Sequence, residues 1–279
     1  MMRAIEAGLR AGRVIPYLGP GMLALATPAD AVPASNQALA AQISAAVTVP
    51  HKIRGNVTAA AQFVENFKRR KTLRTIMQHA FAPRAAPSAL HRRIAALAPL
   101  PLLVHAWYDD LPQQALAGRR DWGMIQGLSQ AEHFGTWTRA YAADGTQADP
   151  GACRAWATTL YQPLGSIAPA QNFLISDSDF VEVLTEIDIQ TPIPAEVQDI
   201  RSGRAFLFLG CRFATQIERI FAHQIIKRSS DRHWAVLPEE PTKNERRFLA
   251  QHGVERLDIT LADFAAALDA GPAGASLAA

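Results

Sequence analysis

Short apolar runs alternate with amphipathic stretches through the last third of the chain. Three runs bounded by turn residues predict buried strands at Ala205–Leu209, Trp234–Leu237 and Val254–Ile259. Each is followed by apolar residues at helical spacing, which predict helices at Ala214–Arg228, Thr242–His252 and Leu261–Leu268. Thr242 and Glu245 form a capping-box pattern, and Thr260 is a candidate N-cap. Strand and helix in regular succession predict a parallel sheet with helices on both faces.

The same alternation opens the chain. Val14–Leu18 predicts a buried strand that ends in Gly19-Pro20-Gly21, and Leu100–Val104 predicts a second one. A mainly helical block between them, at about residues 35–98, is expected to form one layer or lid that covers one side of the sheet. Its helices are Ser35–Ala46 with Ser35 as N-cap, Val57–Lys68, Thr72–Phe81 and Ser88–Leu97. Further helices are expected at Arg3–Leu9, Leu111–Leu116, Ser178–Glu186 and Pro194–Arg201.

The segment at about residues 121–161 has a mixed pattern. Polar and apolar residues alternate over Thr136–Tyr141 and Arg154–Tyr161, with turn-rich sequence between them, which predicts a small antiparallel insert. The fold expected for the chain is therefore α/β, a doubly wound Rossmann-like parallel sheet with a helical layer and a small inserted β segment. We expect one domain over residues 1–270, and a flexible tail over 271–279, which lacks periodicity.

Composition narrows the functional classes. Hydrophobic residues make up 49% of the 279 positions and charged residues 19%, which favours a large buried core. The 28 Lys and Arg residues nearly balance 25 Asp and Glu, so a nucleic-acid partner is not expected. Cys153 and Cys211 form no Cys-x-x-Cys pair, which argues against a thiolate zinc site or a disulfide framework and favours a cytoplasmic protein. No apolar stretch approaches membrane length, and no metal site is predicted.

The Gly19-Pro20-Gly21 loop follows a predicted strand. Glycine has no Cβ, so such a loop can let a pyrophosphate approach the backbone N–H groups. Pro20 removes one of those donors, and a tight structural turn explains the glycines equally well. Both interpretations stay open at this stage.

A second polar group follows the strand near residue 104. His105, Asp109 and Asp110 suggest a metal or acid–base cluster, but His105 ends a strand, so the three side chains need not converge. The simpler interpretation is that Asp109 and Asp110 cap the helix that begins at Leu111. No Gly-x-Ser-x-Gly elbow or P-loop occurs, which argues against a serine hydrolase of that type and a P-loop nucleotidase.

Several segments taken in order resemble the sirtuin-like NAD-binding family, in the branch found in bacterial NAD-consuming defence proteins without the zinc site. The resemblance runs from about Arg13 to Leu268. In this chain, Gly19-Pro20-Gly21 stands where the family has a Gly-Ala-Gly loop, Ala31-Val32-Pro33 where it has Gly-Ile/Val-Pro, and Pro87–His91 where it has the helix before the central strand. His105–Asp109 replaces the family's Thr-Thr-Asn-Tyr-Asp motif, and Gln162–Ser166 replaces its Lys-Leu-His-Gly-Ser motif. Phe206–Phe213 matches a strand and loop with the sequence Leu-Phe-Leu-Gly-Tyr-Ser-Leu, and Thr215 stands where an Asp is usual.

Two departures fall on the positions that matter most. The resemblance implies that the Asn and the His of these motifs help to cleave the bond between nicotinamide and ribose. Trp107 and Leu164 stand at those positions, and neither side chain can accept a proton. Both are bulky and apolar, so we expect a pocket that is inert and partly filled.

The resemblance also implies a set of cofactor-binding positions: Gly19, Pro20, Gly21, His105, Tyr108, Asp109, Gly165, Ser166, Gly210 and Cys211. With Trp107 and Leu164 in place, we expect no catalytic residue and a pseudoenzyme that acts as a regulatory or partner-binding protein, through a protein partner or as a homo-oligomer. One alternative is an NAD glycohydrolase that uses His105, Asp109 or Ser166. Another is a module that binds NAD or ADP-ribose without turnover.

Overall fold

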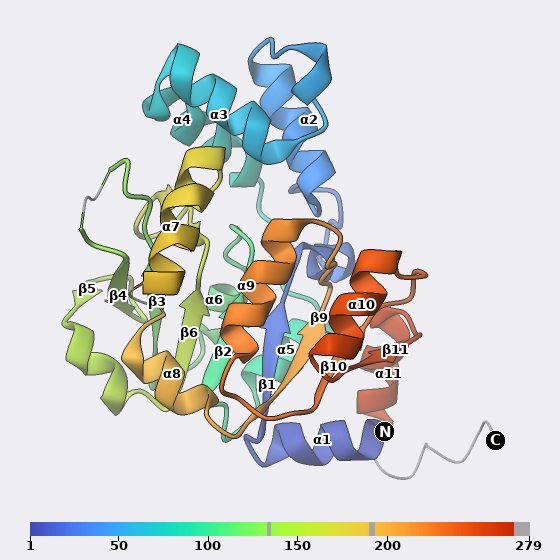
Figure 1. Cartoon of the computed structure of the whole chain (residues 1–279). Coiled ribbons are helices and arrows are strands. Elements are labelled where there is room, and N and C mark those ends of the chain that lie inside the picture. The colour runs from blue at the N-terminus through green and yellow to red at the C-terminus, as the bar shows by residue number, and fades with distance from the viewer. Residues whose placement is uncertain (133–134, 190–192, 271–279) are drawn as a thin grey trace.

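A mostly parallel sheet runs through the molecule (Figure 1). The structure is a computed structural model, and it describes residues 1–132, 135–189 and 193–270. Within these residues the nine strands lie in the order β11 (Val254–Leu257), β10 (His233–Val236), β9 (Ala205–Leu209), β1 (Val14–Leu18), β2 (Leu102–His105), β6 (Thr158–Gln162), β3 (Trp122–Gly127), β4 (Thr138–Ala142) and β5 (Gln147–Ala148). Neighbours from β11 to β3 are parallel, and β4 and β5 are antiparallel at the edge. The predicted α/β fold is confirmed.

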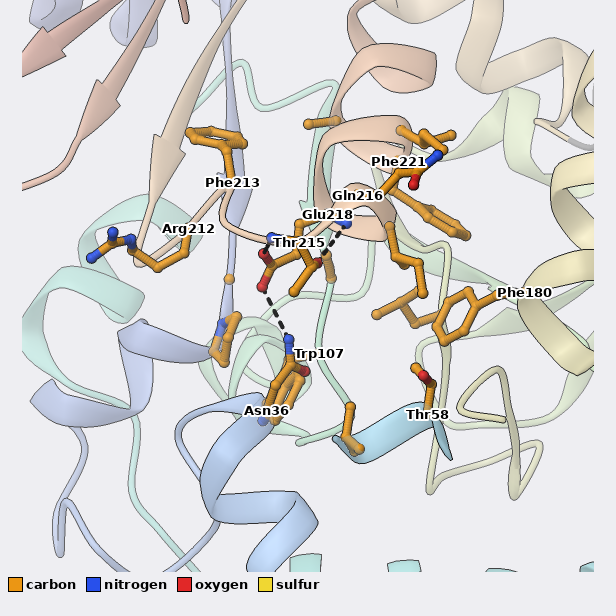
Figure 2. A pocket seen from close by; sticks show the side chains of 18 of the residues that line it. Asn36, Thr58, Trp107, Phe180, Arg212, Phe213, Thr215, Gln216, Glu218 and Phe221 are labelled. Atoms are coloured by element: carbon orange, nitrogen blue, oxygen red, sulfur yellow. Dashed lines mark hydrogen bonds between the residues drawn. The ribbon is translucent and has the colours of Figure 1, made fainter. Parts of the chain in front are cut away.

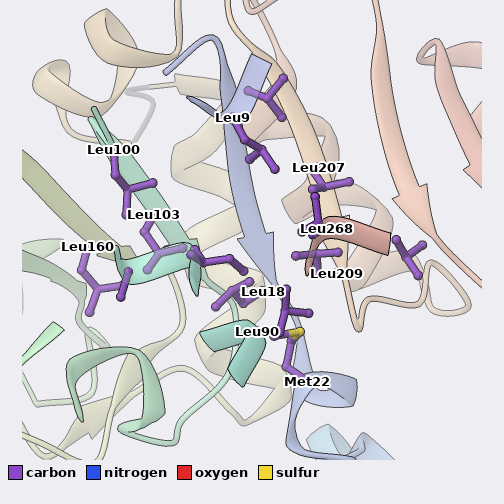
Figure 3. Close-up of a cluster of buried hydrophobic side chains, with 14 of the residues drawn as sticks. Leu9, Leu18, Met22, Leu90, Leu100, Leu103, Leu160, Leu207, Leu209 and Leu268 are labelled. Atoms are coloured by element: carbon purple, nitrogen blue, oxygen red, sulfur yellow. The ribbon is translucent and has the colours of Figure 1, made fainter. Parts of the chain in front are cut away.

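Successive side chains of a strand point to opposite faces of the sheet, and in these strands the residues on both faces are apolar. Helices therefore cover both faces. Leu18, Leu207 and Leu209 face one core, and Tyr17 and Phe208 face the other. The first core, shown in Figure 3, is completed by α1 (Met2–Arg10), α5 (Ala89–Ala95), α6 (Leu111–Leu116) and α11 (Leu261–Asp269). The second core is completed by α8 (Ala195–Arg201), α9 (Gln216–Ile226) and α10 (Lys243–Gln251).

Three helices of the predicted layer stand beyond the carboxyl ends of the strands (Figure 1). They are α2 (Asn36–Ala46), α3 (Val57–Lys68) and α4 (Arg70–Phe81), and α7 (Asp177–Ile189) packs against α3. Their shared core contains Trp107 and Tyr108, which follow the end of β2. The expectation that all helices of residues 35–98 cover one side of the sheet is therefore wrong, since only α5 does so. Trp107 and Tyr108 pack with α2–α4 in a hydrophobic core that is separate from the two cores of the sheet.

The segment 121–161 differs from the expected insert. Its strands β3 and β6 join the main sheet in parallel, and only β4 and β5 are antiparallel. Strand β3 contains Gly123, where a Cβ would lie 2.2 Å from the ring of Trp156. That glycine makes room for an indole packed against the strand. A separate two-stranded sheet pairs β7 (Gly165–Ser166) with β8 (Asn172–Phe173).

The helix starts agree with the predicted caps. Ser35 accepts a hydrogen bond from the Ala38 N–H group, and Thr242 and Thr260 each form a capping box. Short 3₁₀ helices lie at η1 (Pro20–Leu25), η2 (His51–Ile53) and η3 (Pro150–Ala155). In the part of the chain that the structure describes, no helix combines the length and the apolar character needed to cross a membrane. The expected tail, 271–279, lies outside the described residues.

Candidate functional site

The strand order places a crevice at the carboxyl ends of β1 and β9. From β1 the chain continues to β2 on one side, whereas β9, β10 and β11 lie on the other side. Open α/β sheets bind ligands at such a switch point. A cavity of about 670 Å³ lies there, lined by residues that follow β1, β2 and β9 and by residues of α2, α3, α7 and α9 (Figure 2). This volume is in the range of small-molecule sites.

The glycine loop after β1 forms one edge of the cavity through Gly19 and Pro20. Its N–H groups are already used: Gly19 donates to the Leu209 carbonyl at 2.8 Å, Gly21 donates to the Gly210 carbonyl at 2.9 Å, and Pro20 has no N–H group. A Cβ on Gly210, whose φ is +64°, would lie 2.3 Å from the Met22 nitrogen. The glycines therefore allow two backbones to cross in contact, which favours the structural-turn interpretation of this loop.

Trp107 lines the cavity but is anchored in the core of α2–α4. Its side chain is 2% exposed, and its indole N–H donates to the Pro33 carbonyl at 2.8 Å. The ring centroid lies 5.0 Å from that of Tyr108 and 6.2 Å from that of Phe81. Leu164, in the turn between β6 and β7, also lines the cavity. Both apolar side chains line a cavity that is still about 670 Å³, and the expected partial filling of the pocket stays a prediction.

His105 and Asp109 lie together, buried and outside the cavity lining. His105 Nε2 is 3.1 Å from Asp109 Oδ2, and Gln162 Nε2 is 3.4 Å from His105 Nδ1. Burial alone would raise the pKa of Asp109, but the neighbouring His105 and the Leu111 N–H group lower it. The two side chains do converge, which the sequence left open.

The capping interpretation holds for only one of the two carboxylates. Asp109 accepts from the Leu111 N–H group at 3.0 Å, whereas Asp110 makes no side-chain cap and accepts from Gln114. Among the described residues, no group of three or more His, Cys, Asp and Glu side chains could hold a metal ion. The Asp109 carboxylate therefore bonds to His105 and the Leu111 N–H group in the protein interior and does not line the cavity.

The remaining positions implied by the resemblance divide between the lining and the interior. Tyr108 and Cys211 line the cavity, and burial raises the pKa of the Cys211 thiol far above its usual value, so it stays protonated. Ser166 is fully buried and donates to the Tyr108 carbonyl at 3.2 Å. The implied positions that do not line the cavity are Gly21, His105, Asp109, Gly165, Ser166 and Gly210.

The central polar residue of the cavity, Glu218, was missed by the sequence reasoning. It is the third residue of α9, and its carboxylate accepts from the Thr215 N–H group at 2.8 Å and from the Asn36 amide at 3.0 Å (Figure 2). Burial raises the pKa of Glu218 despite these hydrogen bonds. The capping-box pattern of Thr215 and Glu218 was a usable signal. The partnership with Asn36, 182 positions away, was not visible in the sequence.

The charges around the cavity are mostly acidic. Asp177 and Glu218 line it, and Arg212 is the only basic residue among the described lining residues. The Arg212 guanidinium is bound by Glu245, with Nε and Nη2 each 2.9 Å from a carboxylate oxygen, and by Glu239. In Figure 2 it points away from Glu218. Arg212 therefore acts on Glu218 only at longer range, and among the described lining residues neither Glu218 nor Asp177 forms an ion pair with a basic side chain.

Comparison with known proteins adds a family match over the sheet. A model described as SIR2-like domain matches residues 101–257, more than half of the chain. The match begins just before β2 and ends with β11, so it includes both Trp107 and Leu164. No curated protein matches the chain.

Proposed function

The chain belongs to the SIR2-like domain family, and from this membership we propose that it is a non-catalytic member that binds a ligand in the cavity and does not cleave NAD. The observation that carries the proposal is the lining itself. Trp107 and Leu164 face the cavity where the resemblance implies an Asn and a His, while His105, Asp109 and Ser166 are buried outside it. A retained pocket with replaced reactive positions supports binding without turnover.

The chemistry explains why these replacements matter. Cleavage of the bond between nicotinamide and ribose needs groups that hold water and stabilise positive charge on the sugar. An indole N–H can only donate, and that of Trp107 is already bonded to the Pro33 carbonyl. A leucine side chain can neither donate nor accept. Loss of such groups costs several powers of ten in rate, at about 1.4 kcal/mol for each factor of ten.

NAD glycohydrolysis remains the second candidate, on one specific observation. Glu218 places a carboxylate in the cavity, and a carboxylate can stabilise an oxocarbenium-like sugar. The residues first considered for this activity, His105, Asp109 and Ser166, do not line the cavity. If the protein were an enzyme, Glu218 would therefore be the residue to test.

Incubation of the pure protein with NAD tests the proposal. We expect nicotinamide release, followed by chromatography, to stay at the level of a protein-free control. Release at about one per second would contradict the proposal, since that rate is ordinary for an enzyme. If Glu218→Gln abolished the release while His105→Ala did not, the glycohydrolase with Glu218 would replace the proposal.

We also propose that the protein acts through a protein partner or a second copy of itself. A domain without turnover can influence a cell only through what it binds. Sedimentation velocity of the purified chain tests the second-copy form, because a dimer sediments faster than a monomer. If the chain is a monomer at all concentrations, the homo-oligomer is ruled out and only the proposal of a protein partner stands.

A further inference from the structure

The cavity offers few donors to a phosphate. The N–H groups of Gly19 and Gly21 are bonded to carbonyls of β9 and the loop after it, and the Met22 N–H group donates to Gly19 at 3.2 Å. At the start of α9, the capping box occupies the N–H groups of Thr215 and Glu218. Phosphate sites in nucleotide folds depend on such groups being free. A pyrophosphate would therefore find these N–H groups already bonded, and its backbone contacts at α9 would be limited to the Gln216 and Ile217 N–H groups of the first turn, which Glu218 shares.

The charges oppose a phosphate as well. The Glu218 carboxylate lies in the first turn of α9, at the helix end where an anion would otherwise be stabilised. Asp177 adds a second acidic group at the rim. Arg212 is held by Glu239 and the fully buried Glu245, so it cannot turn to an anion without leaving those carboxylates unpaired.

The walls suit a ligand with an apolar or aromatic body. Trp107, Phe180 and Phe221 line the cavity, and the rings of Phe180 and Phe221 meet edge to face at 5.8 Å (Figure 2). Aromatic faces attract cations through the negative potential of the ring. Aromatic walls beside a carboxylate without a basic partner in the lining are complementary to a positively charged organic group.

We propose that this cavity binds a small organic cation, a pyridinium or alkylated ammonium group on an apolar body, with Glu218 as its counter-ion, and that it rejects ligands carrying a pyrophosphate. The inference rests on the proposed function, because it names the ligand class of the same non-catalytic pocket. It departs from the dinucleotide that the fold alone suggests. The cation would be desolvated between Glu218 and the rings, where electrostatic attraction is stronger than in water.

A matched pair of probes isolates the charge. N-methylnicotinamide is a pyridinium cation of almost the same shape as neutral nicotinamide, and ADP-ribose supplies the pyrophosphate. We expect calorimetry with the full chain to give an affinity for N-methylnicotinamide at least about ten-fold above that for nicotinamide. No heat of binding should be detected with ADP-ribose at about millimolar concentration. At that concentration the measurement would miss only a complex with a dissociation constant well above about 1 mM.

Two variants assign the preference to the cavity. Glu218→Gln keeps an acceptor for the capping box and removes the charge, so the ten-fold preference should fall to about two-fold or less. Val181 lines the cavity and is 63% exposed, so Val181→Lys adds a positive charge at little risk to folding. It should weaken the cation by about three-fold or more, while Val181→Gln, the matched neutral control, should not.

The outcomes separate the inference from the proposed function. Equal affinity for the two pyridines, no detectable cation binding, or ADP-ribose binding tighter than the cation would each overturn the inference. ADP-ribose binding with no NAD cleavage would leave the non-catalytic function standing. NAD cleavage in the parallel assay would overturn the function itself.

Discussion

Trp107 belongs to two parts of the molecule at once. Its side chain lines the cavity and also packs with Phe81 and Tyr108 in the core that it shares with α2–α4. A polar residue at this position would therefore change more than the pocket. The indole is part of the surface on which the helical layer rests.

Trp107→Asn should accordingly destabilise the protein more than it alters ligand binding. We expect the free energy of unfolding to fall by about 3–5 kcal/mol, because a large buried ring is lost and a cavity is left. Urea denaturation followed by circular dichroism measures the change. The control is Phe67→Asn on α3, whose ring is 68% exposed and should cost about 1 kcal/mol or less. A loss as small as the control would show that the indole does not support the layer.

Single residues were predicted unevenly from the sequence. Trp107 and Leu164 both line the cavity, at positions that only the resemblance to a known family had pointed to. The contact between His105 and Gln162 could not be expected, because the two residues lie 57 positions apart. Glu218 was overlooked although its capping box with Thr215 is a local signal, and only its hydrogen bond with Asn36 had no signature in the sequence.

Among the elements, α10 shows how one cap can hold a loop. Glu245, the third residue of the helix, accepts from the Thr242 N–H group within its capping box and from the Phe213 N–H group in the loop after β9. Its carboxylate also receives Arg212. The start of α10 thereby fixes the loop that forms one edge of the cavity.

This cap predicts a particular dependence of stability on pH. Burial alone would raise the pKa of Glu245, but hydrogen bonds from Arg212 and from the Thr242 and Phe213 N–H groups lower it from 4.5 to about 2. A lowered pKa in the folded state means that the carboxylate stabilises the fold above about pH 4.5 and loses this effect as the pH falls towards 2.

Glu245→Gln should therefore cost roughly 1–3 kcal/mol at neutral pH and progressively less below about pH 4.5. Denaturant titrations at a series of pH values measure the difference between the variant and the parent protein. Glu240→Gln provides the control, because that side chain is 72% exposed and its ion pairs are worth little. A difference that did not shrink in acid would assign the effect to packing rather than to charge.

The elements themselves were largely predictable because their signals are local. Ser35, Thr242 and Thr260 cap the helices that the periodicity indicated. Strand β3 was missed, as were the two-residue strands β5, β7 and β8, and the reason for its Gly123 is the indole of Trp156, which lies elsewhere in the chain. Local patterns indicate which element a segment can form. They do not indicate that a glycine is needed to make room for an aromatic ring from a distant part of the chain.

For the whole molecule, one guanidinium ties the helical layer to the body. Arg70, at the start of α4, is 2.8 Å from Asp179 in α7 and 3.2 Å from Glu65 in α3, and it also donates to the Phe173 carbonyl. The Asp179 side chain is 1% exposed. Breaking a buried ion pair on one side leaves an uncompensated charge, which is the costly case.

Arg70→Met should loosen the layer as a unit. We expect a loss of about 3–5 kcal/mol in unfolding free energy and faster amide exchange in α3 and α4 than in β1 or β9. Hydrogen exchange read by mass spectrometry resolves the two regions. Arg74→Met is the matched control, since Arg74 is 38% exposed and pairs with Glu132 at the surface. Uniform acceleration over the whole chain would show that the layer has no separate stability.

The global arrangement was predictable only in part. Alternating strands and helices are sufficient to predict a parallel sheet with two covered faces, because crossover connections follow fixed rules. The position of α2–α4 beyond the strand ends depends on Arg70 reaching Asp179, 109 positions away, and on two aromatic residues after β2. Such contacts are properties of the assembled chain rather than of any one segment.

The hydrogen bond from Asn36 to Glu218 joins the first residue of α2 to the third residue of α9. Any ligand that recruits the Glu218 carboxylate must share it with the Asn36 amide or displace that amide. Where the ligand displaces the amide, occupancy of the cavity and attachment of the helical layer are thermodynamically linked, and the linkage is reciprocal: each interaction weakens the other by the same free energy. The layer would in this way report whether the cavity is filled, without any bond in the ligand being broken.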